Sequence, residues 1–158
     1  MAAAKKKETF WSEPIAKVDL QRAAVVPSGT TIVDAVKEMK VNQIGCVLVV
    51  DKAGKLLGIL SNGDLMHEFV GSTLPGDTPV DTIMTKDPFT GTPELSVQEA
   101  LEIFHSKPFR HMPVLSGDQI KGILSIRGLM AFIGEHLPVE VMNLPPDSSL
   151  IAARPSGE

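Results

Sequence analysis

The sequence predicts a mixed α+β fold, an α/β sandwich in which two copies of one small unit share a core. Three observations lead to this prediction. The chain has 158 residues, a length that fits one compact domain. A nine-residue phrase occurs twice, and in both copies the apolar periodicity changes from helix to strand in the same order.

The repeated phrase begins at Gly58 and again at Gly122, an offset of 64 residues. It reads Gly-Ile-Leu-Ser-Asn-Gly-Asp-Leu-Met in the first copy and Gly-Ile-Leu-Ser-Ile-Arg-Gly-Leu-Met in the second, so only the three positions after the serine differ. Upstream, Ala35 aligns with Ala100 at an offset of 65, so one residue is lost in between. The loss falls within turn-forming strings, where a hairpin loop tolerates deletion.

Each copy begins with a helix signal, because apolar residues recur at i, i+3, i+4 and i+7. These residues are Ile32, Ala35, Val36 and Met39 in the first copy and Val97, Ala100, Leu101 and Phe104 in the second. Thr31 with Asp34 resembles a capping pair, and Ser96 with Glu99 forms a capping box. Both helices therefore have a marked beginning.

A β-hairpin is expected after each first helix, because short apolar and β-branched runs flank a turn. The runs are 46–50 and 56–60 in the first copy, and 112–115 and 120–124 in the second. The shared serine then opens a second helix in each copy, which Gly71 and Gly134 are expected to end. Extended segments are expected ahead of the first helices, at 24–26 and 89–90.

This order divides the chain into two repeats, which can bury their apolar faces only by sharing a core. The expected segments are an N-terminal extension (1–17), the first repeat (18–71), a linker (72–79), the second repeat (80–134) and a C-terminal extension (135–158). Phe10 and Trp11 in the N-terminal extension are expected to fold back onto the core. The C-terminal extension is expected to lie on the body of the protein or to be loose in solvent, and its apolar side chains suggest docking.

Composition excludes several classes of function. Fifteen Lys and Arg residues against 19 Asp and Glu residues give a net charge of -4, which disfavours nucleic acid as a partner. The single cysteine, Cys46, allows no disulfide within the chain and no paired thiols for zinc, which favours the cytoplasm. No stretch has the length of a membrane span. No nucleophile with a base and no spacing of metal ligands indicates an enzyme or a metal site.

The doubled unit resembles the CBS-domain pair, also called the Bateman module. The resemblance covers about residues 18–133, and it rests on the phrase of glycine, apolar pair, serine, two residues and aspartate, and on Ile-Met-Thr-Lys-Asp-Pro at 83–88. It implies a sandwich with two clefts related by a pseudo-two-fold axis, and no catalysis. The family's clefts commonly bind adenosine-containing ligands, so AMP, ADP or ATP is the expected ligand and S-adenosylmethionine is possible.

The resemblance also implies site residues in the first copy. In the family, the aspartate of the phrase accepts hydrogen bonds from the ribose hydroxyls, the serine lies near ribose or phosphate, and backbone near the second strand reads adenine. These roles fall on Asp64, Ser61 and the Gly45–Cys46 backbone. An ionised carboxylate is an acceptor with two oxygens and matches a cis-diol. Ser61 also stands at a helix start, where free N–H groups favour phosphate.

The second copy keeps its serine, Ser125, but has Gly128 at the aspartate position, which removes the ribose acceptor. It carries cations instead, at Lys107, Arg110, His111 and Arg127. We therefore expect one composite nucleotide site. Asp64 and Ser61 would hold the ribose, and Arg110, His111 or Arg127 would neutralise phosphate.

Other interpretations of the same residues stay open. Ser61 and Asp64 also spell a capping box, which needs no ligand. The cations can be ordinary surface charges, and Cys46 lies in an apolar run typical of a buried small side chain. A nucleotide sensor with no attached effector domain would act through another, unknown protein. The alternative function is a homodimerisation module whose second helices form the seam and whose nucleotide site is vestigial.

Overall fold

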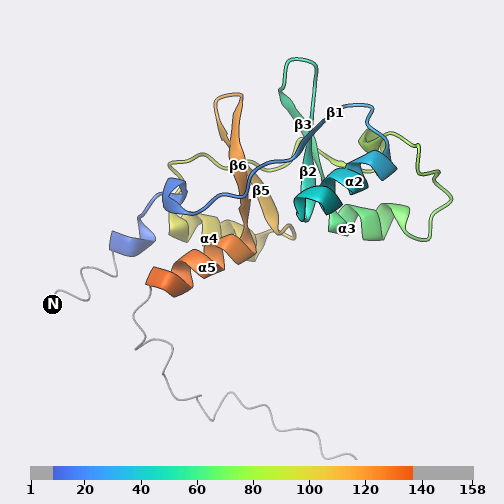
Figure 1. Cartoon of the computed structure of the whole chain (residues 1–158). Coiled ribbons are helices and arrows are strands. Elements are labelled where there is room, and N and C mark those ends of the chain that lie inside the picture. The colour runs from blue at the N-terminus through green and yellow to red at the C-terminus, as the bar shows by residue number, and fades with distance from the viewer. Residues whose placement is uncertain (1–8, 137–158) are drawn as a thin grey trace, which may run out of the picture.

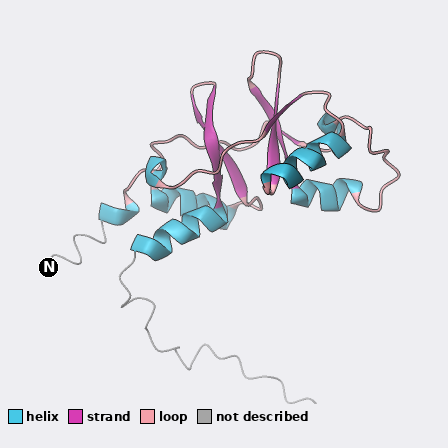
Figure 2. Cartoon of the chain, in the orientation of Figure 1, coloured by secondary structure: helices cyan, strands magenta, loops and turns pink. Residues whose placement is uncertain are grey.

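The computed structural model describes residues 9–136 of the chain. Two β-hairpins stand side by side in the middle of the molecule, and a pair of helices flanks each hairpin on its outer side (Figure 1). Helices and strands both contribute to each half (Figure 2). The predicted mixed α+β class is therefore confirmed.

The first repeat follows the predicted order of elements. These are β1 (Val25–Pro27), α2 (Ile32–Asn42), β2 (Cys46–Val50), β3 (Leu56–Ser61), α3 (Asn62–Asp64) and its continuation η2 (Leu65–Phe69). Thr31 caps α2, as predicted, by accepting a hydrogen bond from the Asp34 backbone N–H. The second helix ends before Gly71, whose φ of 82° places it in the left-handed region that favours glycine.

The second repeat has the same order with two differences from the predictions. Its elements are β4 (Thr85–Lys86), α4 (Val97–Ser106), β5 (His111–Ser116), β6 (Gln119–Ser125) and α5 (Ile126–His136). The predicted stop at Gly134 is wrong, because α5 continues through it to His136. The extended pairing expected at 89–90 lies instead at Gly91, which forms a single parallel bridge with Val114.

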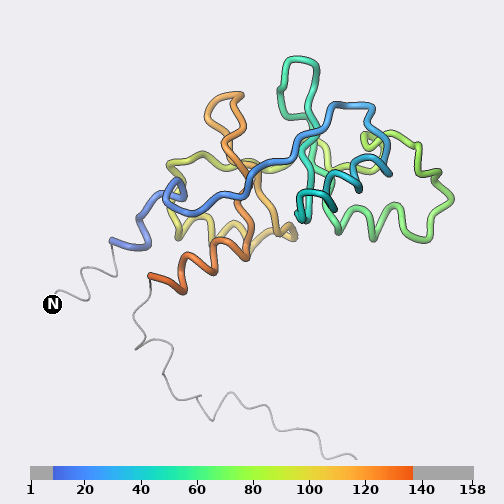
Figure 3. Tube along the Cα trace, viewed as in Figure 1, coloured from blue at the N-terminus to red at the C-terminus, as the bar shows by residue number. Residues whose placement is uncertain are grey.

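The strand pairings of the two halves repeat each other. In the first half, β1 runs parallel to β2, and β2–β3 and β3–β4 are antiparallel. In the second half, Gly91 bridges β5 in parallel, β5–β6 is antiparallel, and Gln21 bridges Ile123 of β6 in antiparallel fashion. This correspondence is the pseudo-two-fold relation that the resemblance implied. The trace in Figure 3 shows the two hairpins related in this way.

The segment that leads into each repeat packs into the other repeat. These segments contain two short 3-10 helices, η1 (Ile15–Lys17) and η3 (Val80–Thr82). The Ile15 N–H donates to the Leu95 carbonyl at 2.7 Å, and the Val80 N–H donates to the Thr30 carbonyl at 2.8 Å. Ile15 is fully buried in the core of the second repeat and Val80 in that of the first. Each repeat therefore completes its core with residues from the other.

Strand β2 is buried on both faces, which explains its uninterrupted apolar sequence. Val47 and Val49 pack in the core of the first repeat beneath α2. Cys46 and Leu48 point the other way and form a separate cluster that includes Ile123 from the second hairpin. Because successive side chains of a strand alternate between its faces, this one strand joins a repeat core to the centre of the molecule.

The N-terminal segment packs on the second repeat, which confirms that prediction. Phe10 and Trp11 pack against the core that α4 and α5 cover. The Phe10 ring stacks on Phe132 at 5.8 Å and on His136 at 5.7 Å between centroids. We call Phe10 and Trp11 the N-terminal clip. The predicted C-terminal docking lies outside the described residues.

Candidate functional site

Asp64 lies at the start of the second helix of the first repeat, where it forms a capping box with Ser61. The Ser61 hydroxyl accepts from the Asp64 backbone N–H at 3.3 Å. In return, Oδ2 of Asp64 accepts from the Ser61 N–H and from its hydroxyl, both at 2.7 Å. The capping interpretation of this pair is therefore correct in geometry, and both side chains are half-buried.

A third donor reaches Asp64 from β4, the strand that leads into the second repeat. The hydroxyl of Thr85 donates to Oδ1 of Asp64 at 3.1 Å. A carboxylate offers about four lone-pair positions, and the Ser61 and Thr85 bonds use three of them. Two hydroxyls of a cis-diol can bind only if one present donor gives way, and the rotatable Thr85 and Ser61 hydroxyls can do so.

The two repeats meet beside this cluster, at Gly45 and His111. A Cβ atom added to Gly45 would lie 3.1 Å from Cε1 and 3.2 Å from Nε2 of the His111 ring. The same atom would lie 3.4 Å from the amide nitrogen of Asn62, the residue after Ser61. The glycine therefore lets the imidazole of the second repeat lie against the first. We call Gly45, Asn62 and His111 the junction.

The junction and the Asp64 cluster are linked through neighbouring strands. Ser61 is the register partner of Cys46, which follows Gly45 on β2. In the second hairpin, His111 is the register partner of Ser125. The two hairpins thus connect Asp64 with the start of α5 through the contact of the His111 ring with Gly45. The predicted residues Ser61, Cys46, Gly45, His111 and Ser125 lie along this path.

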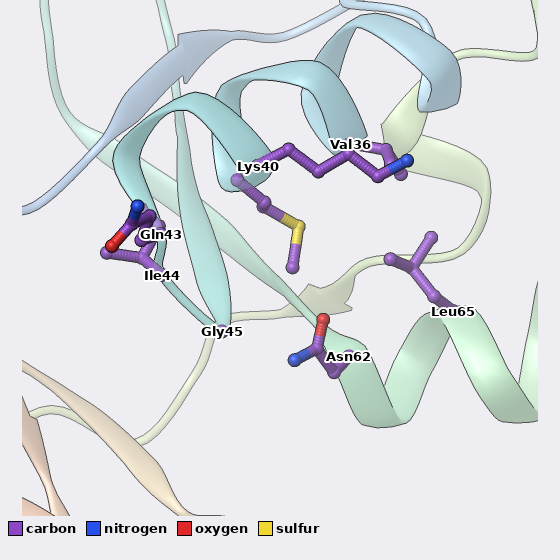
Figure 4. Close-up of a pocket in the computed structure, with 8 residues that line it drawn as sticks. Val36, Lys40, Gln43, Ile44, Gly45, Asn62 and Leu65 are labelled. Carbon is purple, nitrogen blue, oxygen red and sulfur yellow. The ribbon is translucent and has the colours of Figure 1, made fainter.

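An open pocket of about 400 Å³ lies between α2 and α3, next to the junction (Figure 4). Its apolar wall is made by Val36, Met39, Ile44 and Leu65, and its polar residues are Lys40, Gln43, Gly45 and Asn62. In the close-up, the Lys40 side chain extends toward Val36 and away from Asn62. The pocket therefore shares Gly45 and Asn62 with the junction, but the Lys40 ammonium group lies away from both residues.

The second copy lacks the counterpart of the Asp64 cluster. The Ser125 hydroxyl accepts from the Gly128 N–H at 3.0 Å, so the serine still caps the helix. Residue 128 has no carboxylate to complete a box, and Gln21, which pairs with Ile123 as Thr85 pairs with Ile59, stands in the place of Thr85. Within residues 9–136, only the first repeat therefore has a carboxylate at the position that would accept hydrogen bonds from a ribose.

The predicted cations are distributed unevenly around this arrangement. The Arg110 carbonyl accepts from the Ile126 N–H at 3.0 Å, which places the backbone of Arg110 beside the start of α5 and of Arg127. Both arginine side chains are exposed. In the described part of the chain, no ion pair joins either arginine to Asp64. His111 alone among the predicted cations is placed at the junction.

Burial changes the protonation of two residues here. Burial, together with the charge of Asp64, raises the pKa of the Cys46 thiol to about 12, so the thiol stays protonated and is a poor nucleophile. Burial and the adjacent Arg110 charge lower the pKa of His111 below its ordinary value. The imidazole is therefore neutral at pH 7.

Sequence reasoning missed two residues of this arrangement. Thr85 belongs to the phrase at 83–88, which indicated the family but gave no sign that its hydroxyl reaches Asp64. Asn62 is one of three positions that differ between the repeated phrases, and it aligns with Ile126. In the described ranges, no group of three or more His, Cys, Asp or Glu side chains could hold a metal ion. No helix there has the length and apolarity to cross a bilayer.

Comparisons with known proteins agree with this architecture. The CBS domain family model matches residues 16–71 and 80–135. An uncharacterized 17.7 kDa protein of Acidianus ambivalens is 34% identical over 116 residues, which cover 73% of this chain and 70% of that protein. The CBS domain-containing protein CBSCBSPB3 of Arabidopsis thaliana is 30% identical over 113 residues, or 71% of this chain, yet the match spans 20% of that longer protein.

Solved structures share the fold. An uncharacterized conserved protein from Pyrococcus horikoshii superposes with a TM-score of 0.74 at 22% identity, covering 81% of this chain and 97% of that one. CBSX2, whose crystal structure is a complex with AMP, superposes with a TM-score of 0.65 at 19% identity, covering 77% of this chain and 96% of that one. At these identities the likeness concerns the fold alone.

Proposed function

The chain belongs to the CBS-domain family, and from that premise we propose that its paired repeats bind one adenosine nucleotide in a composite site. Asp64 and Ser61 hold the ribose, and the second repeat supplies positive charge for the phosphate. CBS-domain proteins are generally regulatory rather than catalytic, so binding acts by changing the shape of the module or its affinity for another protein. A ligand does this when it binds one conformation better than another.

One observation carries the proposal: a carboxylate suited to a ribose lies in the first repeat, and cationic or titratable side chains suited to a phosphate lie in the second. The first repeat holds a half-buried carboxylate with hydroxyls that can give way to a diol. The second repeat brings His111 against Gly45 of the first repeat, and Arg110 precedes His111 in the chain. AMP bound to the related fold of CBSX2 supports an adenosine ligand for this arrangement.

Removal of the Asp64 charge tests the ribose role. Asp64→Asn should weaken AMP binding by about 10- to 100-fold, because a hydrogen bond to a charged group contributes about 1.5–3 kcal/mol. Binding can be measured by calorimetry and by thermal unfolding with AMP, ADP, ATP and S-adenosylmethionine. Ligand at 100 times its Kd should stabilise the protein by about 2.7 kcal/mol.

The chain offers a matched control at Glu99. Glu99 closes the same kind of capping box on Ser96, with distances of 2.7–3.2 Å, at a helix start away from the junction. Glu99→Gln should therefore weaken a helix cap to a similar degree and leave nucleotide affinity unchanged. Equal loss of affinity in both variants, or none in Asp64→Asn, would reduce Asp64 to a capping residue.

The alternative is a homodimerisation module, and exposed apolar side chains on the second helices favour it as a second candidate. Met66 is 64% exposed, Val70 59% and Met130 51%. Phe132 on the second helix of the second repeat packs on Phe10, so it is a poor probe of a free surface. Met66→Asp with Met130→Asp should convert a dimer to a monomer in light scattering. An unchanged mass would count against the seam.

A further inference from the structure

His111 occupies a position where one repeat enters the other. It is the first residue of β5 and is half-buried. Its ring reaches the first repeat because residue 45 has no side chain, since a Cβ there would lie 3.1–3.2 Å from two ring atoms. In the second repeat, the position equivalent to Gly45 is Arg110, and the first-repeat position equivalent to His111 is Cys46, so the residues of this contact have no counterpart.

The groups around the imidazole include no partner for a positive charge. Arg110 precedes it on its own strand, and its charge acts against protonation of the ring. Ser125 is its register partner on β6, and Gly45 and Asn62 approach from the first repeat. Within residues 9–136, no carboxylate forms an ion pair with His111. An anion at the junction would face an imidazolium as soon as the ring took up a proton.

We propose, on the basis of the proposed function, that nucleotide binding at the junction is coupled to uptake of one proton by His111, so that affinity for phosphorylated ligands rises as pH falls. The proton comes from solvent and binds the unprotonated ring nitrogen. No bond of the ligand breaks. The resulting imidazolium faces the phosphate, and the charge of Arg110 lies on the preceding residue.

The direction of the effect follows from linkage. In the free protein, burial and Arg110 disfavour the imidazolium. A phosphate monoester carries about -1.5 to -2 charges at pH 7, so its binding favours the imidazolium instead. Between the pKa of the free protein and the higher pKa of the complex, each bound nucleotide takes up a proton. Affinity must then increase with proton concentration over that range.

Calorimetry with AMP and with adenosine measures this coupling. Titrations between pH 6.0 and 8.0, in two buffers of different ionisation enthalpy, give the number of protons taken up per ligand. For AMP we expect net uptake and a Kd that rises by up to about tenfold per pH unit, the limit for one proton. For adenosine, which has no phosphate, we expect no uptake and a flat profile.

Two variants assign the proton to His111. His111→Gln should remove the uptake and flatten the AMP profile, except for the part that belongs to the phosphate of AMP itself. His105→Gln changes an exposed histidine on α4 and should behave as the unmodified chain does. AMP binding with the same proton uptake in the unmodified chain and in His111→Gln would overturn the coupling and leave the proposed function intact. Failure of every nucleotide to bind would overturn both.

Discussion

The second helices of the two repeats begin with the same repeated phrase. They differ in helix type, in N-terminal capping and in the residues that pack on them. In the first repeat, Asp64 closes the capping box, and the helix continues as a π-helix in which Val70 N–H donates to Leu65 O at 2.9 Å. Two residues separate Met66 from Phe69, whereas one separates Met130 from Phe132. A π-turn accommodates one extra residue, and such turns are frequent at functional sites.

In the second repeat the same element is a regular α-helix that other residues cover. The N-terminal clip packs on α5 through Phe132 and His136. Phe104 and Phe109 pack in the core of this repeat, and their rings meet edge to face at 5.9 Å. The aligned positions of the first repeat are Met39 and Ile44, which line the open pocket. One repeat thus keeps a carboxylate and open space, while the other is packed and supplies positive charge.

The largest expected effect concerns the exchanged entry segments, which make the two repeats depend on each other. Ile15→Ala should lower the free energy of unfolding by about 2–5 kcal/mol, because a fully buried isoleucine is removed from the core of the second repeat. Urea unfolding measures this loss. Val25→Ala, at a 46% exposed position, is the control. If both variants unfolded at the same urea concentration, Ile15 would contribute no more than a surface residue.

This exchange marks the limit of what the sequence could predict. Helix starts at Thr31 and Ser96 could be predicted because capping depends on residues three positions apart. The hydrogen bond from Ile15 to Leu95 joins residues 80 positions apart, and no local pattern specifies such a partner. The same holds for the site: the Ser61–Asp64 box is local, whereas contacts of Thr85 with Asp64 and of His111 with Gly45 arise from tertiary packing.

A smaller effect is expected when the second repeat is given the missing carboxylate. Gly128→Asp should stabilise the protein by about 1–2 kcal/mol, from reduced chain entropy and a completed capping box. Gly128→Ala isolates the entropy contribution of about 0.4–1 kcal/mol. The added Cβ lies 3.2 Å from the Ser125 hydroxyl, which must shift slightly.

The same variant tests whether a carboxylate alone makes a ribose site. Gln21 occupies the position of Thr85 and has no hydroxyl, so we expect calorimetry to give one AMP per chain for Gly128→Asp, as for the unmodified protein. A stoichiometry of two would show that the aspartate is the sole missing element. A loss of stability would show that the second helix cannot accept the box at all.

Replacing the glycines near the ends of the two second helices by alanine should change protein stability in opposite directions. Gly134 lies inside α5 with open space around it, so Gly134→Ala should stabilise the protein by about 0.5–1 kcal/mol. Gly71 has a φ of 82°, so Gly71→Ala should destabilise it by roughly 1 kcal/mol despite equal space. Thermal unfolding of both variants decides the matter. Unfolding temperatures that shift in the same direction would contradict the conclusion that the two second helices end differently.

The smallest effect concerns the pH dependence of the unliganded protein. The pKa of His111 is lower in the folded chain than in the unfolded chain, where it is near 6.5. Its contribution to stability is therefore present above pH 6.5 and is lost as pH falls below it. Thermal unfolding at pH 7.5 and 5.5 should show a larger loss for the unmodified chain than for His111→Gln. Equal losses of stability in the two proteins would mean that the junction does not disfavour protonation of His111.

The sign of this effect connects the two repeats with the proposed ligand. The imidazole that the second repeat places against Gly45 destabilises the empty junction at low pH, under the conditions in which a phosphate would bind it best. AMP added at pH 5.5 should therefore raise the unfolding temperature more than the same excess added at pH 7.5. Since His111→Gln has no such charge to neutralise, the part of the pH dependence that His111 contributes should disappear from the empty and the liganded protein together.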